Sequence, residues 1–303
     1  MNQARVIYTG WSGWEVRALS YSQANEMSEC GKKFELKRIS GWEEKLTGAS
    51  LKFGIACENA VVAYLAGGVD PVKKFDSEWE TWKNQELSYS SKDGDWEHLS
   101  GVGRGLMKEF PRQHKDRFAV IDGGKCFFQK KLRYSEINQG GLWNGVDIEY
   151  IADCIQPNLP ILLDFKTASA SYPEPQGDDL NFIGWDHQLS IGAWMSGIRN
   201  VGFITMVKTK TPKIQFITGR VTDEAIENVQ LWLKRQLDRI LNKDFTREIG
   251  FKFPNQHCTW CEVAEVCIGS PEKALAAGIL TKKVSKSNDI ESQINALDAL
   301  EEV

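Results

Sequence analysis

The chain contains 303 residues, of which 42% are hydrophobic and 26% are charged, and its formal net charge is −4 at pH 7. This composition excludes a disordered or fibrous protein, and the net charge excludes a uniformly basic nucleic-acid coat protein but leaves room for a local basic groove. No apolar run reaches the ~20 residues that span a bilayer, and the first residues lack the order of a secretory signal. We therefore expect a cytosolic globular protein with no membrane contact.

The N-terminal part of the sequence predicts helices. Residues 18–38 predict a helix with Ser22 as its N-cap. Residues 50–66 predict a second helix, because apolar side chains recur at helical spacing, and two glycines at 67–68 end it. Residues 76–123 are rich in acids and tryptophan, and they predict one or two helices with a polar loop, in an inserted subdomain.

From residue 126 onward the pattern changes mainly to strands. Residues 144–154 and 161–167 flank a turn that contains proline and asparagine, so they predict an antiparallel hairpin. Thr222 predicts the N-cap of a strong helix whose apolar residues repeat every three to four positions. The remaining expected elements are a helix over 180–196 and strands over 126–134, 201–208 and 213–221.

This order of elements predicts an α/β fold with a mixed central sheet flanked by helices. We expect five parts along the chain. They are a helical N-terminal part of the core (1–69), a helical insertion (70–123), a core that carries the chemistry (124–250), a cysteine-rich region (251–281) and a polar tail (282–303).

Acidic side chains and one lysine converge on the predicted hairpin. Asp164 and Lys166 are two positions apart on one strand, so they point to the same face, and Asp147 lies on the strand joined to it. Buried carboxylates need a cation, and hard oxygen ligands suit Mg²⁺ or Mn²⁺. Glu58, an acid within an apolar helix, is the candidate third ligand. Such a site serves phosphodiester hydrolysis; the alternative is an ion pair on an edge strand.

Three cysteines lie within ten residues, in the spacing C-x2-C-x5-C. They are Cys258, Cys261 and Cys267. The chain has seven cysteines in all, an odd number, and a reducing compartment disfavours structural disulfides. The cluster therefore predicts a metal site, either tetrahedral zinc or an iron–sulfur cluster, which needs a fourth ligand. The alternative is three small apolar side chains at the start of a helix.

Taken together, these features resemble the PD-(D/E)XK nuclease superfamily, and within it the RecB-like branch with an iron–sulfur cluster. That branch includes the AddB-type nucleases and small CRISPR-associated exonucleases. Four segments match in order: 19–34, 52–58, 145–147 with 164–166, and 258–267. The sequence departs from the branch at Gly31, which stands in place of a proline, at Gly145, which comes two residues before the aspartate instead of three, and at Gly192, in place of a tyrosine.

The resemblance implies a role for each matching residue. The Mg²⁺ or Mn²⁺ ligands would be Glu58, Asp147, Asp164 and the carbonyl of Phe165, and Lys166 would be the catalytic lysine. Gln188 would contact the reacting phosphate or the lysine. A 4Fe–4S cluster that links the first helix to the C-terminal region would be held by Cys30, Cys258, Cys261 and Cys267. The resemblance also implies a restriction-endonuclease-like core.

Basic and aromatic residues offer further contacts for DNA, although a solvated helix face or core packing is the alternative for each. The basic candidates are Lys32, Lys33, Lys37, Arg38, Lys130, Lys131, Lys208 and Lys210. Trp79, Trp82 and Trp96 are core residues or base-stacking residues.

The sequence thus predicts a divalent-metal-dependent deoxyribonuclease, an exonuclease at DNA ends or single strands, with a structural 4Fe–4S cluster. We expect it in recombination, repair or phage DNA processing, in the cytosol of a bacterium or of a phage-infected host. The chain lacks an ATPase phosphate-binding motif, so a helicase or recombinase is the expected partner. The competing hypotheses are a non-catalytic binding module on the same fold and a zinc-binding interaction domain. The choice between exonuclease and endonuclease action, the strand polarity, the preference for single or double strands and the oligomeric state stay open.

Overall fold

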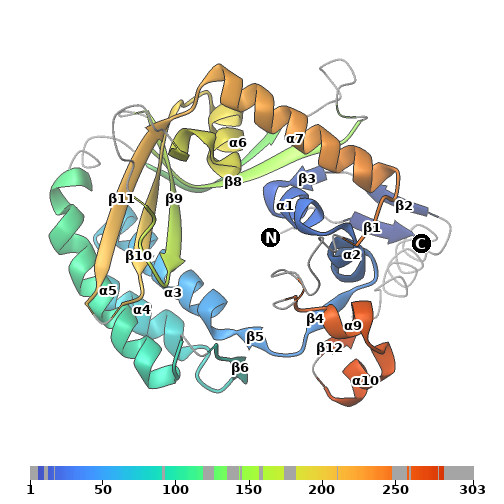
Figure 1. Ribbon diagram of the computed structural model, residues 1–303. Helices are drawn as coiled ribbons and strands as arrows, with labels where there is room; N and C mark the ends of the chain where they lie inside the picture. The colour runs from blue at the N-terminus through green and yellow to red at the C-terminus, as the bar shows by residue number, and fades with distance from the viewer. Residues whose placement is uncertain are drawn as a thin grey trace, which may run out of the picture. The chain divides into compact units, whose positions relative to one another are not determined.

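Figure 1 shows the computed structural model of the chain. The structure describes residues 6–9, 13–16, 18–90, 93–118, 126–134, 143, 145–156, 160–173, 182–209, 211–247, 258, 261–278 and 280–282. The predicted polar tail beyond residue 282 and the candidate Lys210 lie outside these ranges.

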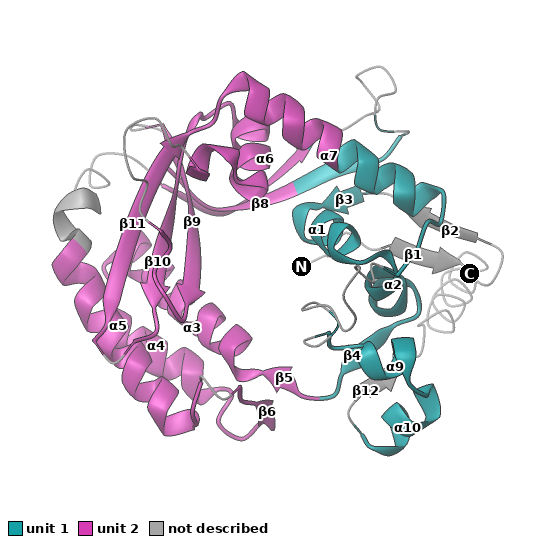
Figure 2. Ribbon diagram, viewed as in Figure 1, with its two compact units in different colours: residues 1–45, 134–149, 233–303 teal, residues 46–133, 150–232 magenta. Residues whose placement is uncertain are grey.

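The chain forms two compact units, which Figure 2 distinguishes by colour. Unit 1 comprises residues 1–45, 134–149 and 233–303, and unit 2 comprises residues 46–133 and 150–232. The division into five consecutive parts stays a prediction, because each of the two units combines segments from different parts of the chain.

Unit 2 is built on a mixed sheet with the strand order β11-β10-β9-β8, and β7 also pairs with β8. The strands are β7 (Phe127–Tyr134), β8 (Asp147–Gln156), β9 (Ile161–Ala168), β10 (Asn200–Val207) and β11 (Lys213–Arg220). β8 and β9 form an antiparallel hairpin, β9 and β10 are parallel, and β10 and β11 are antiparallel. β10 is buried from Val201 to Val207, as expected for a strand at the centre of a sheet that is covered on both faces.

Helices cover both faces of this sheet (Figure 1). On one face lie α3 (Ala49–Gly67), α4 (Pro71–Glu80) and α5 (Trp96–Phe118), and on the other lies α6 (His187–Ser196), preceded by the 3₁₀ turn η4 (Phe182–Trp185). Two short parallel strands pair with each other: β5 (Thr47–Gly48), which precedes α3, and β6 (Leu87–Ser88), which follows α4. The predicted α/β fold with a mixed sheet between helices is therefore confirmed.

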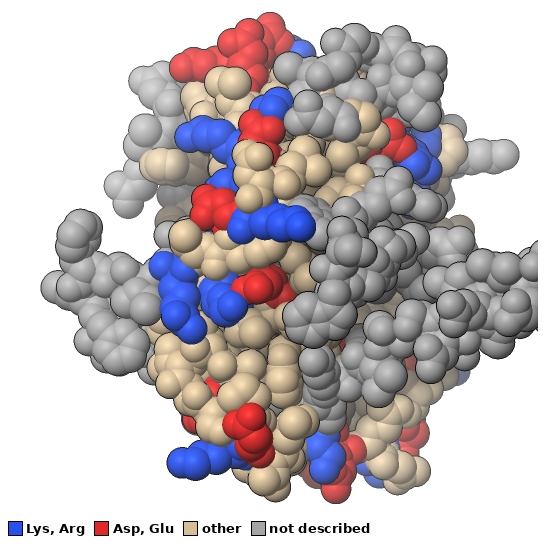
Figure 3. Space-filling model, turned by 90° about the vertical axis from the view of Figure 1, so that its right-hand side faces the viewer, with Lys and Arg blue, Asp and Glu red and all other residues tan. Residues whose placement is uncertain are grey.

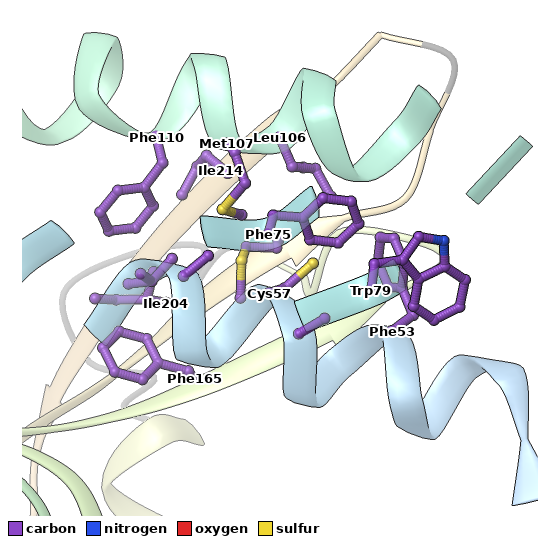
Figure 4. Packing of buried hydrophobic residues seen from close by; sticks show 14 of the residues in the cluster. Phe53, Cys57, Phe75, Trp79, Leu106, Met107, Phe110, Phe165, Ile204 and Ile214 are labelled. Atoms are coloured by element: carbon purple, nitrogen blue, oxygen red, sulfur yellow. The ribbon is translucent and has the colours of Figure 1, made fainter. Parts of the chain in front are cut away.

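The core of unit 2 lies between the three helices and the sheet (Figure 4). Phe165 of β9 and Ile204 of β10 face the helices there. Because side chains alternate along a strand, Asp164 and Lys166 project from the opposite face, toward α6. Phe53 packs edge-on against both Phe75 and Trp79, with ring centroids 5.7 and 5.9 Å apart.

The predicted insertion thus forms α4 and α5 and contributes large side chains to the core. Trp79 is 2% exposed and stacks on Trp96 at 4.3 Å between centroids. The indole N–H of Trp79 donates to the hydroxyl of Ser100 at 2.9 Å. Trp79 therefore packs in the core, and its ring is not available for base stacking.

Unit 1 contains short elements from three parts of the chain. Its helices are α1 (Tyr21–Glu29), α2 (Gly31–Phe34), the π-helical turn η1 (Glu35–Ile39), α9 (Ala264–Ile268) and α10 (Pro271–Ala276). Its strands are β1 (Val6–Thr9), β2 (Gly13–Val16), β3 (Ala18–Ser20), β4 (Trp42–Glu44) and β12 (Leu280–Lys282). β1 pairs with β2 and β4 with β12, whereas β3 pairs in parallel with the first residues of β8.

The single helix predicted over residues 18–38 is wrong in two details. The N-cap of α1 is Ser20, not Ser22, because the Ser20 and Gln23 side chains form a reciprocal capping box. The helix then breaks at Cys30, whose backbone is extended. Gly31 begins the next helix, where a β-carbon would lie 2.9 Å from the carbonyl oxygen of Asp244, so this close approach requires glycine.

The predicted Thr222 cap is confirmed, since its hydroxyl accepts the backbone N–H of Ala225 at 3.1 Å. It begins α7 (Asp223–Leu241), the helix that leaves unit 2 and enters unit 1. Among the helices that the structure describes, none combines the length and the apolar character needed to cross a membrane.

Candidate active site

The candidate site lies in unit 2, where the β8–β9 hairpin brings two aspartates together. The register runs from Gln156 opposite Ile161 to Cys154 opposite Leu163, so the next step places Asp153 opposite Asp164. There the carboxylate of Asp153 accepts the backbone N–H of Phe165 at 2.9 Å. The side chain of Asp153 thus accepts the backbone N–H of the neighbouring strand, and this hydrogen bond holds its carboxylate beside Asp164.

Asp164, Lys166 and Gln188 form a closed set of polar contacts. The Nζ of Lys166 lies 2.7 Å from Oδ2 of Asp164 and donates to Oε1 of Gln188 at 2.9 Å. The Nε2 of Gln188 donates to Oδ1 of Asp164 at 2.5 Å. Gln188 is the second residue of α6, and the Asp186 side chain caps that helix by accepting the N–H of Leu189 at 2.9 Å. The cap therefore fixes the helix end that presents Gln188.

Glu58 of α3 joins the group through Gln129 of β7. The amide nitrogen of Gln129 donates to Oε1 of Glu58 and lies 3.4 Å from Oδ1 of Asp153. Gln129 has a positive φ of 49°, which is uncommon for a residue with a side chain. Three carboxylates from α3, β8 and β9 and the amine of Lys166 thus belong to one electrostatic cluster.

Burial and mutual repulsion set the protonation of this cluster. Burial, and then the charge of Asp153, raise the pKa of Glu58 to about 7. The pKa of Asp164 is raised chiefly by its complete burial, against the opposing attraction of Lys166. Burial likewise raises the pKa of Asp153. Burial alone would lower the pKa of Lys166, but Asp164 raises it, so Lys166 stays an ammonium ion.

The cluster suits a hard divalent cation. Its donors are carboxylate oxygens, the ligands that Mg²⁺ and Mn²⁺ prefer. The pKa values of Glu58 and Asp164 are raised, so the positive charge of Lys166 alone does not offset the cost of ionising these buried carboxyl groups. Oδ2 of Asp164 is buried and finds no aligned hydrogen-bond partner among the described atoms, although Lys166 is close to it. The described residues hold no group of three His, Cys, Asp or Glu side chains already gathered tightly enough to chelate a metal. Glu58, Asp153 and Asp164 would therefore have to draw together around the ion.

The expected ligand Asp147 is not part of this cluster. It begins β8 in the other compact unit and pairs with Ala18 of β3. Along the strand it is six residues from Asp153, a spacing of ~20 Å in extended chain. A hairpin pairs residues equidistant from its turn, and counting back through the turn from Asp164 reaches Asp153. That count is the signal in the sequence that identifies Asp153, whereas the sequence gives no signal for Gln129.

Several of the expected DNA contacts are engaged in ion pairs. Lys208 is largely buried, and its amine contacts Asp93 at 2.8 Å and Ser50 at 2.6 Å, so this amine is already paired and its contact with DNA stays a prediction. In unit 1 the pairs are Lys32 with Glu35, Lys33 with Glu29 and Glu262, Lys37 with Glu26 and Glu262, and Arg38 with Glu26. Figure 3 shows basic and acidic side chains interspersed on one face of the molecule.

Two further lysine candidates lie on β7. The amine of Lys130 lies 4.5 Å from the centre of the Phe127 ring, and Lys131 follows it on the same strand. Both lysines are exposed and directly follow Gln129 in sequence, so they stay candidates for phosphate contact.

The four cysteines proposed as cluster ligands all belong to unit 1. None of these four cysteines is in a disulfide, and Cys30 and Cys261 are close enough that the charge of Cys30 adds to the effect of burial in raising the pKa of Cys261. The guanidinium of Arg247 donates to the sulfur of Cys267 at 3.3 Å. In the part of the chain that the structure describes, the thiols are not assembled into a metal-binding group. Their soft donor chemistry suits iron–sulfur or zinc.

None of the curated protein sequences compared with the chain matches it. The chain is similar in structure to a candidate exonuclease from Eubacterium rectale, with 17% identity, a TM-score of 0.49 and coverage of 75% of this chain and 80% of the other. It is also similar to LHK-Exo, solved in complex with dAMP, with 10% identity, a TM-score of 0.28 and coverage of 64% and 93%.

The family comparison covers a larger part of the chain. The model of the PD-(D/E)XK nuclease superfamily matches residues 18–268, which include all three clustered carboxylates, Lys166 and Gln188. Nucleases of this superfamily generally use Mg²⁺ or Mn²⁺. The chain belongs to the PD-(D/E)XK nuclease superfamily.

Proposed function

We propose that the chain is a divalent-metal-dependent deoxyribonuclease that hydrolyses phosphodiester bonds as an exonuclease, at DNA ends or on single strands. One observation carries this proposal, which is the closed contact set of Asp164, Lys166 and Gln188 beside the carboxylates of Asp153 and Glu58. A half-buried ammonium held by an acid and an amide, next to oxygen ligands, suits the hydrolysis of a phosphodiester.

Each residue has a distinct task in this proposal. Glu58, Asp153 and Asp164 would hold Mg²⁺ or Mn²⁺, with the carbonyl of Phe165 as a further ligand. When bound, such an ion polarises a phosphoryl oxygen and lowers the pKa of a water. Lys166 stabilises the negative charge that develops on the phosphate or orients the water. Gln188 accepts from Lys166 and donates to Asp164, so it keeps the ammonium directed at the reacting group.

Activity on end-labelled single-stranded and duplex DNA tests the proposal. We expect cleavage by the wild-type chain with Mn²⁺ or Mg²⁺, none with EDTA, and a loss of about 100-fold or more in Lys166→Ala and Asp164→Ala. Lys83→Ala is the control, since Lys83 is exposed and pairs only with Glu80 among the described residues. Full activity of Lys166→Ala contradicts the proposal, and so does a wild-type chain that binds DNA without cleaving it, which is the behaviour of a binding module.

The second part of the proposal is a 4Fe–4S cluster on Cys30, Cys258, Cys261 and Cys267, as in the RecB-like branch. It is supported by the location of all four thiols in unit 1 and by the electrostatic contact between Cys30 and Cys261. Arg247, which donates to the sulfur of Cys267, would act as a hydrogen-bond donor to the cluster. Analysis of iron and acid-labile sulfide in anaerobically purified protein tests this. Stoichiometric zinc without iron contradicts it.

The biological setting follows from this chemistry. We place the enzyme in the cytosol, in recombination, repair or phage DNA processing, where a helicase or recombinase supplies DNA ends. Co-purification of a DNA-unwinding protein with the tagged chain tests that setting.

A further inference from the structure

Two large aromatic side chains are exposed immediately before the helix that carries Gln188. They belong to η4, where Ile183 and Gly184 are buried while Phe182 is 65% exposed and Trp185 is 44% exposed. A 3₁₀ helix has three residues per turn, so its first and fourth side chains lie on the same side. The turn therefore places the two exposed rings on one side of it, where they are open to a planar ligand.

The turn that carries these rings is firmly attached. The carbonyl of Ile183 accepts the N–H of Asp186 at 3.3 Å, and the carbonyl of Gly184 accepts the hydroxyl of Ser190 at 3.4 Å. Asp186 then caps α6, and Gln188 follows with its contacts to Lys166 and Asp164. Only two residues separate Trp185 from Gln188, so η4 is continuous with the candidate active site.

A third exposed ring reaches the same site from another direction. Tyr172 is 39% exposed, and both of its backbone polar groups bond to the Gln215 side chain at 2.8 Å. Gln215 stands in one cross-sheet row with Thr205 and Lys166. The Tyr172 ring lies 5.8 Å from the Phe203 ring, which in turn lies 5.8 Å from the amine of Lys166.

We propose that Tyr172, Phe182 and Trp185 form an aromatic platform that stacks on unpaired bases of the DNA strand whose phosphate occupies the active site. This inference rests on the proposed nuclease function and narrows its substrate to DNA with a single-stranded segment. Bases within a duplex are already stacked on each other, whereas unpaired bases offer their faces to aromatic rings. Continuity with the site favours the substrate itself as the occupant over a protein partner.

Binding of DNA without hydrolysis tests the platform. The full chain in EDTA is titrated into a fluorescently labelled single-stranded oligonucleotide and into an abasic strand of the same length. We expect the wild type to prefer the intact strand. Phe182→Ala and Trp185→Ala should each weaken binding of the intact strand by about 5- to 150-fold and leave binding of the abasic strand unchanged. Trp185→Phe, which keeps a ring, should retain most of the affinity.

Tyr89→Ala is the matched control, because Tyr89 is a partly exposed aromatic residue, at 36%, that follows β6. Equal losses on the intact and abasic strands, or no loss, overturn the platform, and a preference for blunt duplex over single strand also overturns it. These outcomes are distinct from failure of the proposed function. A wild-type chain that shows the base-dependent binding but never cleaves with Mn²⁺ loses the nuclease assignment alone.

Discussion

The carboxylate of Asp153 accepts a hydrogen bond from the backbone N–H of Phe165 at 2.9 Å, just beyond the last described backbone pair of the hairpin, Cys154 with Leu163. This hydrogen bond places the carboxylate of Asp153 between β8 and β9, next to Asp164. It also ties the acid to the strand that carries Lys166. Asp153 is therefore the part of the candidate cluster that the hairpin itself positions.

The first prediction follows from that position. Asp153→Asn should reduce Mn²⁺-dependent DNA cleavage by about 100-fold or more, because it removes a proposed metal ligand. The amide oxygen can still accept the N–H of Phe165, so the fold should persist. Initial rates on an end-labelled strand measure the loss, with circular dichroism to verify folding.

Asp147→Asn is the matched control, since it makes the same change on the same strand outside the cluster. We expect its activity to stay within a few-fold of the wild type. An inactive Asp147→Asn together with an active Asp153→Asn would show that the sequence-based assignment of Asp147 is right and that the cluster described above is not the active one.

The second prediction concerns Gln129. Its side-chain amide donates hydrogen bonds to the carboxylates of Glu58 and Asp153, which are two of the proposed metal ligands. These hydrogen bonds must break when the carboxylates bind a metal ion. Gln129→Leu removes the competing donor, so Mn²⁺ should bind about 2- to 10-fold more tightly, which corresponds to one ordinary hydrogen bond. Calorimetric titration of the metal-free chain measures this.

Gln85→Leu serves as the control for that titration, because Gln85 is exposed and lies in the turn after α4. Unchanged or weaker Mn²⁺ binding by Gln129→Leu would mean that Gln129 helps to hold the ion and does not compete with it.

The third prediction is a pH dependence that arises at Glu58. Its pKa is about 7 in the folded metal-free chain against 4.5 in an unfolded one, so the folded state binds the proton more tightly. The free energy of unfolding should therefore fall as the pH rises from 4.5 to 7, and stay low above that range. Denaturant unfolding in EDTA should show a shallower fall for Glu58→Gln, and an equal fall in both proteins would contradict the shift.

The strand that carries Asp164 and Lys166 could be predicted from local sequence. The residues of other elements that contact these two side chains could not. Asp164 and Lys166 share a face by strand alternation, and both lie on the predicted strand, so their contact follows from two residues alone. The choice between Asp147 and Asp153 depends on the register of the hairpin. The match of residues 145–147 to the family motif pointed to Asp147 without considering that register. Gln129 meets Glu58 across 71 residues of sequence, a contact that only the folded sheet creates.

The helix predicted over residues 18–38 failed for a related reason. Its spacing is helical throughout, but Gly31 approaches the backbone of Asp244 more closely than a β-carbon allows. Tertiary packing against a distant segment therefore breaks the helix at Cys30, and local propensity does not register it.

The fourth prediction compares two glycines of α5. A β-carbon on Gly103 would lie 2.0 Å from the Phe75 ring, so Gly103→Ala should destabilise the fold by about 1–3 kcal/mol. Gly101 is exposed on the same helix with nothing within 4 Å of the added carbon, so Gly101→Ala should stabilise it by about 0.5–1 kcal/mol. Urea unfolding measures both, and a similar sign for the two variants would contradict the packing of α5 on Phe75.

The fifth prediction concerns the buried pair of Asp93 and Lys208. Burial alone would raise the pKa of Asp93, but hydrogen bonds from Lys208, Ser50 and Ser90 outweigh burial and hold this pKa well below its usual value of 3.8. Because the folded pKa is the lower one, the carboxylate contributes stability above pH 3.8 that is lost as the pH falls below it. Asp93→Asn should therefore cost about 1–3 kcal/mol near neutral pH and show a smaller acid-dependent loss than the wild type. Unfolding free energies at neutral and acid pH decide this, and parallel losses in both proteins would mean that Asp93 titrates normally and that Lys208 is held by other contacts.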